Sequence, residues 1–474
     1  MNFKFLTLSS LFLIHSLFSS TAITLYNQGF GVIRENIDIS LKKGMNQVQF
    51  DGVTRMLETD SIIFREKNDN SNFYILEQNY RNDPINEESL LKHYEGQQIQ
   101  FQTEIDGHPH KLNGKIIRAP SMLSILDPFE NRAIDQFIPP IIELNGQWHT
   151  SLPGTPIFPP LQDTTLLKPT LLWKIQSKET QKMSIELAYL SKGFAWEASY
   201  NLVSPENSNV MKLHAWITLK NTSGANFKDT KIKLVAGEVS KIQKPNYAVD
   251  PFGDVATASM RISARRVEEK SLDEYHMYSV PFLINFRHNE QKQIELLYSD
   301  GVQSKKIYQF NRLKSNSAIR IYREFQNTEE NHLGMPLPAG KVRFYKKDLQ
   351  DHQLEFIGEN IMNHTPKNES VSIYTGDAFD ILGKRSILSS NSSKLERTRT
   401  ESIEIQLTNR KKEKIEIQVL EPIRAGNLNW KVTKSSHPFE KIDNKTLEFK
   451  VPVSANSKEK IQYTLLFSKE ENVK

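Results

Sequence analysis

Residues 333–380 read LGMPLPAGKVRFYKKDLQDHQLEFIGENIMNHTPKNESVSIYTGDAFD, and this stretch decides the fold class. Apolar and polar residues alternate in short runs, and turns rich in Pro, Gly, Asn and Asp separate the runs. This pattern is typical of consecutive β-strands. The same alternation recurs in LHAWITLKN, where Leu213, Ala215, Ile217 and Leu219 fall on one face of a half-buried strand. We therefore predict an all-β protein with very little helix apart from a signal peptide.

The spacing of the predicted strands, near ten residues, favours two large immunoglobulin-like β-sandwich units. A short helix at 87–94, with Asn86 as its N-cap and Gly96 after its end, leads into strands typical of a small SH3- or Sm-like barrel. We expect this barrel to be inserted near the N-terminus. The predicted units are a signal peptide at 1–22, an N-terminal β-unit at 23–82, the small barrel at 83–152, a central sandwich at 153–290 and a C-terminal sandwich at 291–474.

Three further features refine this division. Residues 153–160, rich in Pro, predict a stiff connector. Residues 241–273 interrupt the alternation and predict a mobile inserted loop, whose arginines between 261 and 266 could alternatively bind an anionic polymer. In the last third, the alternating residues 403–407 are predicted to pair with residues 415–419 across a charged turn.

The first 22 residues have the pattern of a signal peptide, with Lys4, an apolar run from Phe5 to Phe18 and small residues up to Ala22. The run is too short for a membrane-spanning helix, which needs about 20 apolar residues, and no later segment reaches that length. The chain has no cysteine, so disulfides, thiolate metal sites and thiol nucleophiles are excluded. A large exported protein without disulfides fits a bacterial envelope, and we expect a periplasmic or secreted location.

Eight blocks along the chain carry a resemblance to a known family. They are LEQNYRND, LAYLSKGFAWEASY, ITLKNTSG, EYHMYSVP, LGMPLPAGKVRFYK, FIGENIMNHTPKN, TNRKKEKI and SSHPFEKIDNKTLEF. With these blocks, residues 23–467 resemble the mucoidy-inhibitor-A-like group of bacterial envelope proteins, whose shared region is called domain of unknown function 4139. The resemblance implies a β-rich envelope protein and no particular reaction. Longer relatives carry a coiled coil, whereas this chain has no sustained heptads and looks like the shorter form.

Motifs for catalysis, nucleotide binding or calcium binding are absent from the sequence: there is no HExxH, GxSxG, GxxxxGK[ST] or EF-hand loop. We therefore predict no catalytic, cofactor-binding or metal-binding residue and no cofactor. His108 and His110, with Glu104 or Asp106, could form a metal site, but we favour the interpretation that they are ordinary turn histidines. A formal charge of +5 over 474 residues is nearly neutral and gives no reason to expect a nucleic-acid partner.

Four residues are candidates for binding. His364 and Lys367 lie in the turn NHTPK, and a polar turn on a rigid scaffold is a common place for binding residues. A hairpin turn whose side chains bond the backbone is the alternative. His276, in EYHMY, and His437, beside Ser435, Ser436 and Glu440, carry the same ambiguity.

These observations favour an exported, non-catalytic binding or assembly module, whose partners are envelope proteins or surface polysaccharide. Exposed edge strands could accept a strand from a partner. The alternative is an envelope hydrolase or lyase that uses His364, His276 or His437 as acid or base. Convergence of His364 with Glu359 and another titratable group inside a pocket would favour that alternative.

Overall fold

The computed structural model describes residues 11–13, 21–66, 72–82, 86–126, 133–161, 168–205, 208–237, 268–272, 275–348, 350–393, 398–426 and 428–469. Within these residues the regular secondary structure is almost entirely strand, with one α-helix and one short 3-10 helix at Thr59–Ser61. The all-β prediction is therefore confirmed. Most of the expected signal peptide and of the loop at 241–273 lies outside the described residues.

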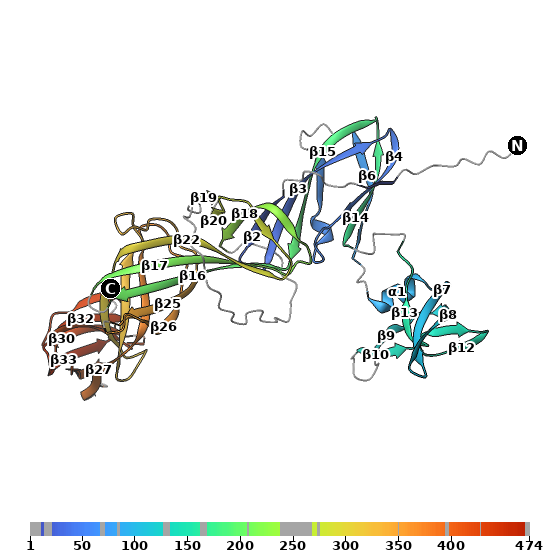
Figure 1. Cartoon of the computed structure of the whole chain (residues 1–474). Coiled ribbons are helices and arrows are strands. Elements are labelled where there is room, and N and C mark those ends of the chain that lie inside the picture. The colour runs from blue at the N-terminus through green and yellow to red at the C-terminus, as the bar shows by residue number, and fades with distance from the viewer. Residues whose placement is uncertain are drawn as a thin grey trace.

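Two sheets form the first part of the molecule (Figure 1). One is four-stranded, in the order β1 (Leu11–Leu13), β4 (Gly44–Asp51), β14 (Thr170–Ser177) and β6 (Phe73–Arg81). The larger has the order β19 (Glu268–Leu272), β20 (Tyr275–Ser279), β18 (Phe227–Ala236), β2 (Ala22–Tyr26), β3 (Phe30–Leu41), β15 (Gln181–Lys192) and β5 (Ile63–Glu66), and β21 (Ile284–Phe286) pairs with β18. The strands of the predicted unit 23–82 thus share sheets with strands of the predicted central sandwich.

A five-stranded sheet packs on this part, in the order β22 (Glu290–Gln303), β17 (Val210–Asn221), β16 (Phe194–Pro205), β25 (Gly340–Lys347) and β26 (Leu354–Met362). Its inner residues and those of the first two sheets form one apolar cluster, which we call the main core. Leu213, Ala215, Ile217 and Leu219 all lie in it, as their alternation predicts.

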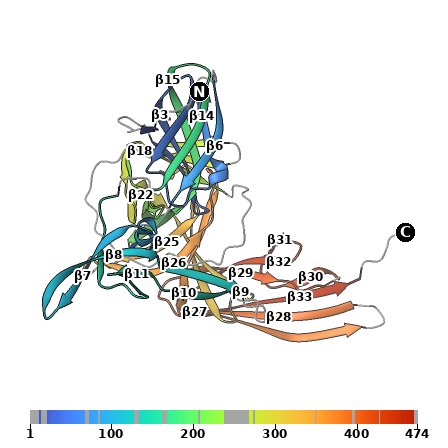
Figure 2. The same cartoon turned by 90° about the vertical axis from the view of Figure 1, so that its right-hand side faces the viewer.

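The C-terminal sheet has nine strands and its own apolar core. Its order is β30 (Asn429–Ser435), β33 (Ser457–Ser468), β28 (Thr398–Asn409), β27 (Ser370–Ser393), β24 (Ala318–Gln326), β23 (Lys305–Asn311), β29 (Ile415–Pro422), β32 (Thr446–Val453) and β31 (Glu440–Asp443). Figure 2 shows β27, β28 and β33 running side by side away from the other sheets. Two of the nine strands also reach the main core, because Phe325 of β24 and Ile373 of β27 are buried there.

One strand pairing predicted from the sequence is wrong. β28 and β29 do not pair with each other: β28 pairs with β27 and β33, whereas β29 pairs with β23 and β32. Their alternating residues instead contribute to the same C-terminal core. An alternating pattern fixes which face of a strand is buried, and it leaves open whether two such strands are neighbours or face each other.

The predicted short helix is confirmed as α1 (Glu87–His93), with a capping box at Asn86 and Gly96 at φ +82° after its end. It packs on a five-stranded sheet in the order β12 (Gln147–His149), β11 (Ile141–Leu144), β8 (His108–Arg118), β7 (Gln98–Ile105) and β13 (Thr155–Ile157), beside a hairpin of β9 (Ser121–Leu126) and β10 (Ala133–Ile138). The residues expected to be a connector belong to this unit, because β13 pairs with β7 and Tyr94 Oη donates to the Pro159 carbonyl.

Candidate functional site

The segment that opens the diagnostic stretch is a loop held in place by one buried asparagine. Asn327 follows β24 and is fully buried. Its Nδ2 lies 2.8 Å from the carbonyl oxygens of both Met335 and Pro366, and its Oδ1 accepts a hydrogen bond from the Gly334 amide at 3.1 Å. One amide group therefore ties together the loop before β25 and the turn before β27.

Two tyrosines fix the same loop from the other side. Tyr200 Oη of β16 donates to the Pro338 carbonyl at 2.6 Å, and Tyr278 Oη of β20 donates to the Pro336 carbonyl at 3.1 Å. Burial, with a smaller contribution from Tyr278, holds the pKa of Tyr200 well above its ordinary value. The hydroxyl therefore keeps its proton and remains a donor. Both acceptors are proline carbonyls of LGMPLPAG. Proline has no backbone N–H, so these two residues add no donor that would need a partner.

The candidate His364 lies on the exposed turn beside this loop. Its Nδ1 accepts a hydrogen bond from the Ala339 amide at 3.1 Å, which assigns the ring proton to Nε2 when the ring is neutral. Partial burial, and to a lesser extent the charge of His276, lower the pKa of His364. The structure therefore brings together two histidines that are 88 positions apart in sequence.

Two other residues named from the sequence form ion pairs with other side chains and do not bond to His364. Glu359 of β26 pairs with Arg343 at 3.5 Å rather than with His364. Lys367 forms an exposed ion pair with Glu329 at 2.5 Å. The hydrogen bond of His364 to the backbone matches the turn-stabilising alternative.

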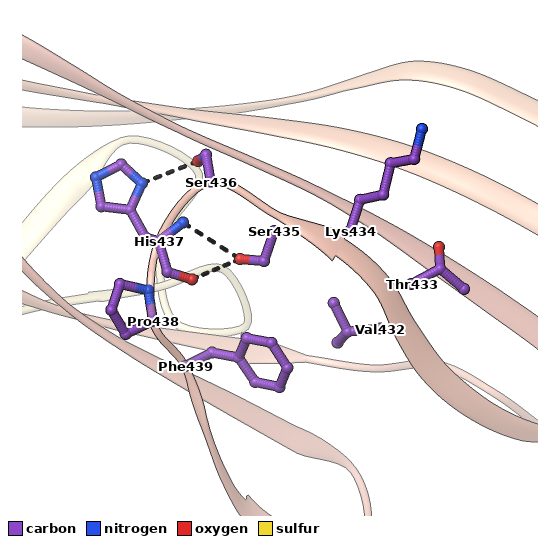
Figure 3. Close-up of a pocket in the computed structure, with 8 residues that line it drawn as sticks. All are labelled: Val432, Thr433, Lys434, Ser435, Ser436, His437, Pro438 and Phe439. Atoms are coloured by element: carbon purple, nitrogen blue, oxygen red, sulfur yellow. Dashed lines mark hydrogen bonds between the residues drawn. The ribbon is translucent and has the colours of Figure 1, made fainter.

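His437 lies in a shallow hollow of about 590 Å³ in the C-terminal sheet (Figure 3). Ser436 Oγ is 2.9 Å from His437 Nδ1, and His437 Nε2 is 3.5 Å from Glu459 Oε1, so the order Ser, His, Glu resembles a triad. However, Ser436 Oγ also accepts the Gln462 amide at 2.8 Å, and all residues that line the hollow come from the single segment 432–439. These bonds anchor the turn to β33, and within the described part of the chain no second element lines the hollow to supply donors for an oxyanion.

Sequence reasoning missed a polar and aromatic group on the five-stranded sheet. His214 of β17 lies 2.8 Å from Glu295 of β22, between their Nε2 and Oε2 atoms. The His214 ring is 4.4 Å from the ring of Trp216 and 5.4 Å from that of Tyr298, between centroids. The alternation that buries Leu213 and Ala215 also places His214 and Trp216 together on the opposite face of β17. These two members of the group could therefore have been predicted from the sequence.

No group of three or more His, Asp or Glu side chains among the described residues could hold a metal ion. His108 and His110 are exposed on β8, opposite Ile105 and Thr103. No described helix is long and apolar enough to cross a membrane.

Residues 185–468 match the family model described as Domain of unknown function (DUF4139), which covers more than half of the chain. The chain belongs to this family. The match confirms the expected DUF4139 family over residues 185–468, and the block LEQNYRND at 76–83 lies outside it. No curated protein matches the chain.

The DUF4139 region begins within β15 and ends at β33, so it excludes the small unit that carries α1. It includes three fully buried asparagines, Asn221, Asn327 and Asn409. Each bonds backbone groups of a turn next to a block that the sequence singled out, as Asn221 does with the carbonyls of Ala225 and Phe286. In this DUF4139 chain, buried asparagines therefore fix the turns that lie in or beside several of the diagnostic blocks.

Proposed function

We propose that this protein is an exported bacterial envelope protein that acts by non-catalytic binding, as an assembly module. Support for export comes from the N-terminal 22 residues and the lack of cysteine. Support for binding comes from the edge strand β26. The partner that fits this edge is an extended segment of another envelope protein.

β26 ends its sheet, so one side of its backbone lacks a neighbouring strand in that sheet. Apolar side chains project from this edge: Leu354, Phe356 and Ile361 share one face, opposite Lys347, Tyr345 and Lys341 of β25, and exposed Ile357 lies at the bulge between them. Ile361 is 75% exposed. Proteins usually protect such edges with charge, proline or a cover, because an exposed apolar edge pairs with other chains. β27 lies against part of this edge, with Asn360 Nδ2 3.5 Å from the Tyr374 carbonyl, and Glu355 and Glu359 add charge to it. The exposed apolar side chains that remain on β26 are the observation that carries the proposal.

The test is site-specific photocrosslinking in envelopes, with the crosslinker at Ile357 or Ile361. The matched control is Leu382, whose exposed fraction is close to that of Ile357 but which lies on β27, a strand paired on both sides. We expect one protein to be captured from both β26 positions and not from Leu382, and capture to be lost in Phe356→Lys.

Three outcomes would contradict the proposal: no capture from β26, equal capture from Leu382, or capture of only a second copy of this chain. β6 provides a further comparison, because it also ends its sheet with exposed Tyr74 and Leu76 but lies outside residues 185–468. Capture from β6 alone would move the interface away from the family region.

Surface polysaccharide is a second candidate partner, and the group of His214, Glu295, Trp216 and Tyr298 favours it. Aromatic rings beside hydrogen-bonding groups suit the apolar faces and hydroxyls of sugars. We expect Trp216→Ala to reduce retention of the protein on immobilised cell-surface polysaccharide. Unchanged retention would remove this candidate, and saturable turnover of such a polymer would contradict non-catalytic binding as a whole.

A further inference from the structure

A positively charged cleft of about 970 Å³ lies where the two large cores meet. Arg323 of β24 lines the cleft and lies at the point of this strand where one core gives way to the other. Ile319, four residues earlier, belongs to the C-terminal core, whereas Phe325, two residues later, belongs to the main core. The cleft also includes Asn209, next to β17, and Tyr308 of β23. It is therefore built from both bodies of the molecule.

Like charges face each other across two strands in this cleft. Lys306 of β23 is the direct partner of Arg323 in the antiparallel ladder with β24. Two cations directly opposite on one face repel each other and destabilise a sheet. Arg323 is half-buried and, among the described residues, bonds only neutral oxygens, Asn209 Oδ1 at 3.5 Å and Ser204 Oγ at 3.4 Å. The fold itself does not explain this pair.

A third cation approaches the same place around Tyr308. Lys411 Nζ donates to Tyr308 Oη at 2.9 Å, and Lys306 Nζ lies 4.9 Å from the centre of the Tyr308 ring. Burial raises the pKa of Tyr308, but the hydrogen bonds and charges of Lys306 and Lys411 outweigh it, so the net pKa is lowered. Because Tyr308 Oη accepts from Lys411, its own proton is available to another acceptor.

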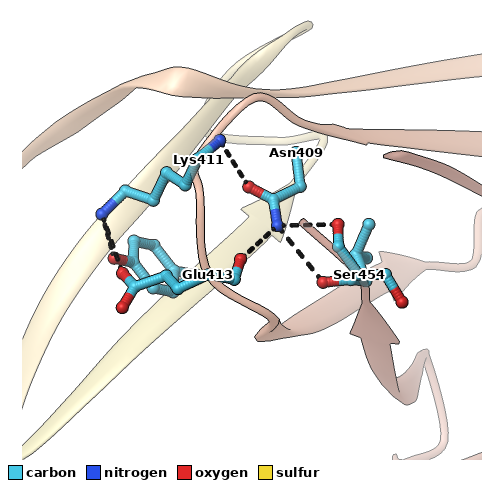
Figure 4. Close-up of polar contacts among 6 residues, drawn as sticks. Asn409, Lys411, Glu413 and Ser454 are labelled. Atoms are coloured by element: carbon cyan, nitrogen blue, oxygen red, sulfur yellow. Dashed lines mark hydrogen bonds and ion pairs between the residues drawn. The ribbon is translucent and has the colours of Figure 1, made fainter. Parts of the chain in front are cut away.

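The turn that carries Lys411 is held rigidly by Asn409 (Figure 4). Asn409 is fully buried, and its Nδ2 contacts the carbonyl oxygens of Glu413, Val453 and Ser454 at 2.9, 3.2 and 3.0 Å. Its Oδ1 accepts the Lys411 amide at 2.9 Å. The lysine is therefore presented from a fixed backbone, which lowers the entropy lost when a ligand binds.

The net charge of the residues that line the cleft is positive. Its lining includes seven lysines and arginines and four glutamates. Two of these glutamates are already engaged: Glu413 lies 3.4 Å from Lys411, and Glu448 lies 3.6 Å from Lys450 and accepts a hydrogen bond from Gln418. An excess of positive charge in a cleft focuses the field on anions.

We propose that this cleft binds a ligand with clustered oxyanions, either phosphate groups or adjacent carboxylates, through Lys306, Arg323 and Lys411. Arg323 can form two parallel hydrogen bonds to one oxyanion, and the two lysines act as point charges. The volume is at the upper end for small-ligand sites, so the ligand extends beyond a single ion. This proposal is independent of the edge strand β26.

The test is calorimetric titration of the purified protein at low salt with tripolyphosphate, citrate, inorganic phosphate and a neutral sugar. Tripolyphosphate and citrate distinguish clustered phosphates from clustered carboxylates. We expect at least one of these two to bind more tightly than inorganic phosphate, no binding of the sugar, and weaker binding as salt is added. Lys306→Gln and Arg323→Gln should each weaken binding about tenfold.

The matched control is Lys233→Gln with Arg424→Gln, which removes two exposed charges outside the cleft and should leave binding unchanged. Lys306→Gln should not lower the melting temperature without ligand, because it relieves repulsion with Arg323. If Arg323→Gln does not fold, Arg323→Lys replaces it, with a smaller expected loss of binding. No binding to the native protein, or equal losses in the control, would overturn the proposal.

Discussion

The turns held by Asn327 and Asn409 use the same device in two different surroundings. In each, a fully buried asparagine amide contacts carbonyls of two separate segments, and its oxygen accepts a backbone amide of the turn. Around Asn327 the loop carbonyls are taken by Tyr200 and Tyr278. Around Asn409 the turn holds Lys411 at a cleft with excess positive charge.

This difference shows that a buried hydrogen-bonding residue does not by itself identify a functional site. What separates the two turns is the charge of their surroundings. His364, at the first turn, accepts a backbone amide, whereas Lys411, at the second, lies beside a cleft with excess positive charge. That cleft also holds Arg323 of β24, which among the described residues has no carboxylate partner. We infer that the first turn stabilises the fold and the second also serves binding.

The largest expected effect is on stability at the first turn. Asn327→Ala would remove the three hydrogen bonds of a fully buried side chain, to the Gly334 amide and to the carbonyls of Met335 and Pro366. We expect a loss of about 3 kcal/mol, since each hydrogen bond contributes about 1 kcal/mol. Chemical denaturation and hydrogen exchange of the Gly334 and Leu337 amides measure it. A loss below about 1 kcal/mol would contradict the role of Asn327.

The second effect combines stability and binding. Asn409→Ala should destabilise the C-terminal sheet by about 2–3 kcal/mol for the same reason. Unlike Asn327→Ala, it should also weaken tripolyphosphate binding, because Lys411 loses its fixed backbone. Denaturation and calorimetry on the two variants test the comparison. Equal tripolyphosphate binding by the two variants, under conditions where both are folded, would contradict the proposed difference between the two turns.

A matched pair of lysines sharpens the same contrast. Lys411→Gln should weaken tripolyphosphate binding about tenfold, since it removes a partly buried charge from the cleft. Lys367→Gln, at the first turn, breaks only an exposed ion pair with Glu329. Such pairs contribute little, so binding and melting temperature should stay unchanged. A clear loss of binding in Lys367→Gln would assign ligand binding to the first turn.

The smallest effect concerns protonation at the first turn. Because the pKa of His364 is lowered in the folded state, the unfolded chain binds this proton more readily. Stability contributed by the neutral ring is therefore lost as the pH falls below its ordinary pKa of 6.5. His276→Gln removes one cause, so the pKa of His364 should rise and the acid loss should shrink. NMR titration of the His364 ring measures this pKa. An unchanged value in His276→Gln would show that His276 does not influence His364.

Local features of the fold could be predicted from the sequence because they depend on neighbouring residues. Asn86 and Gly96 delimit the helix α1, and the alternation around Leu213 and Ile217 gives the buried face of β17. Pairing could not be predicted, since the alternation of β28 fits several neighbours equally well.

The cleft could not be predicted for the same reason. Lys306 and Arg323 come from two strands outside the quoted blocks, and Lys411 comes from a distant turn in the block TNRKKEKI. The opposition of Lys306 and Arg323 becomes visible only when the register of β23 and β24 is known. His276 and His364 were named from the sequence, but their proximity depends on how β20 and the 363–367 turn meet at the loop before β25.

The most direct test of the account is a double-mutant cycle of Asn409→Ala and Lys411→Gln on tripolyphosphate affinity, measured by calorimetry on folded protein. If Asn409 acts on binding through Lys411, Asn409→Ala should weaken binding in the native background and have no further effect in Lys411→Gln. Losses that simply add would contradict the claim that this buried asparagine holds the lysine for binding.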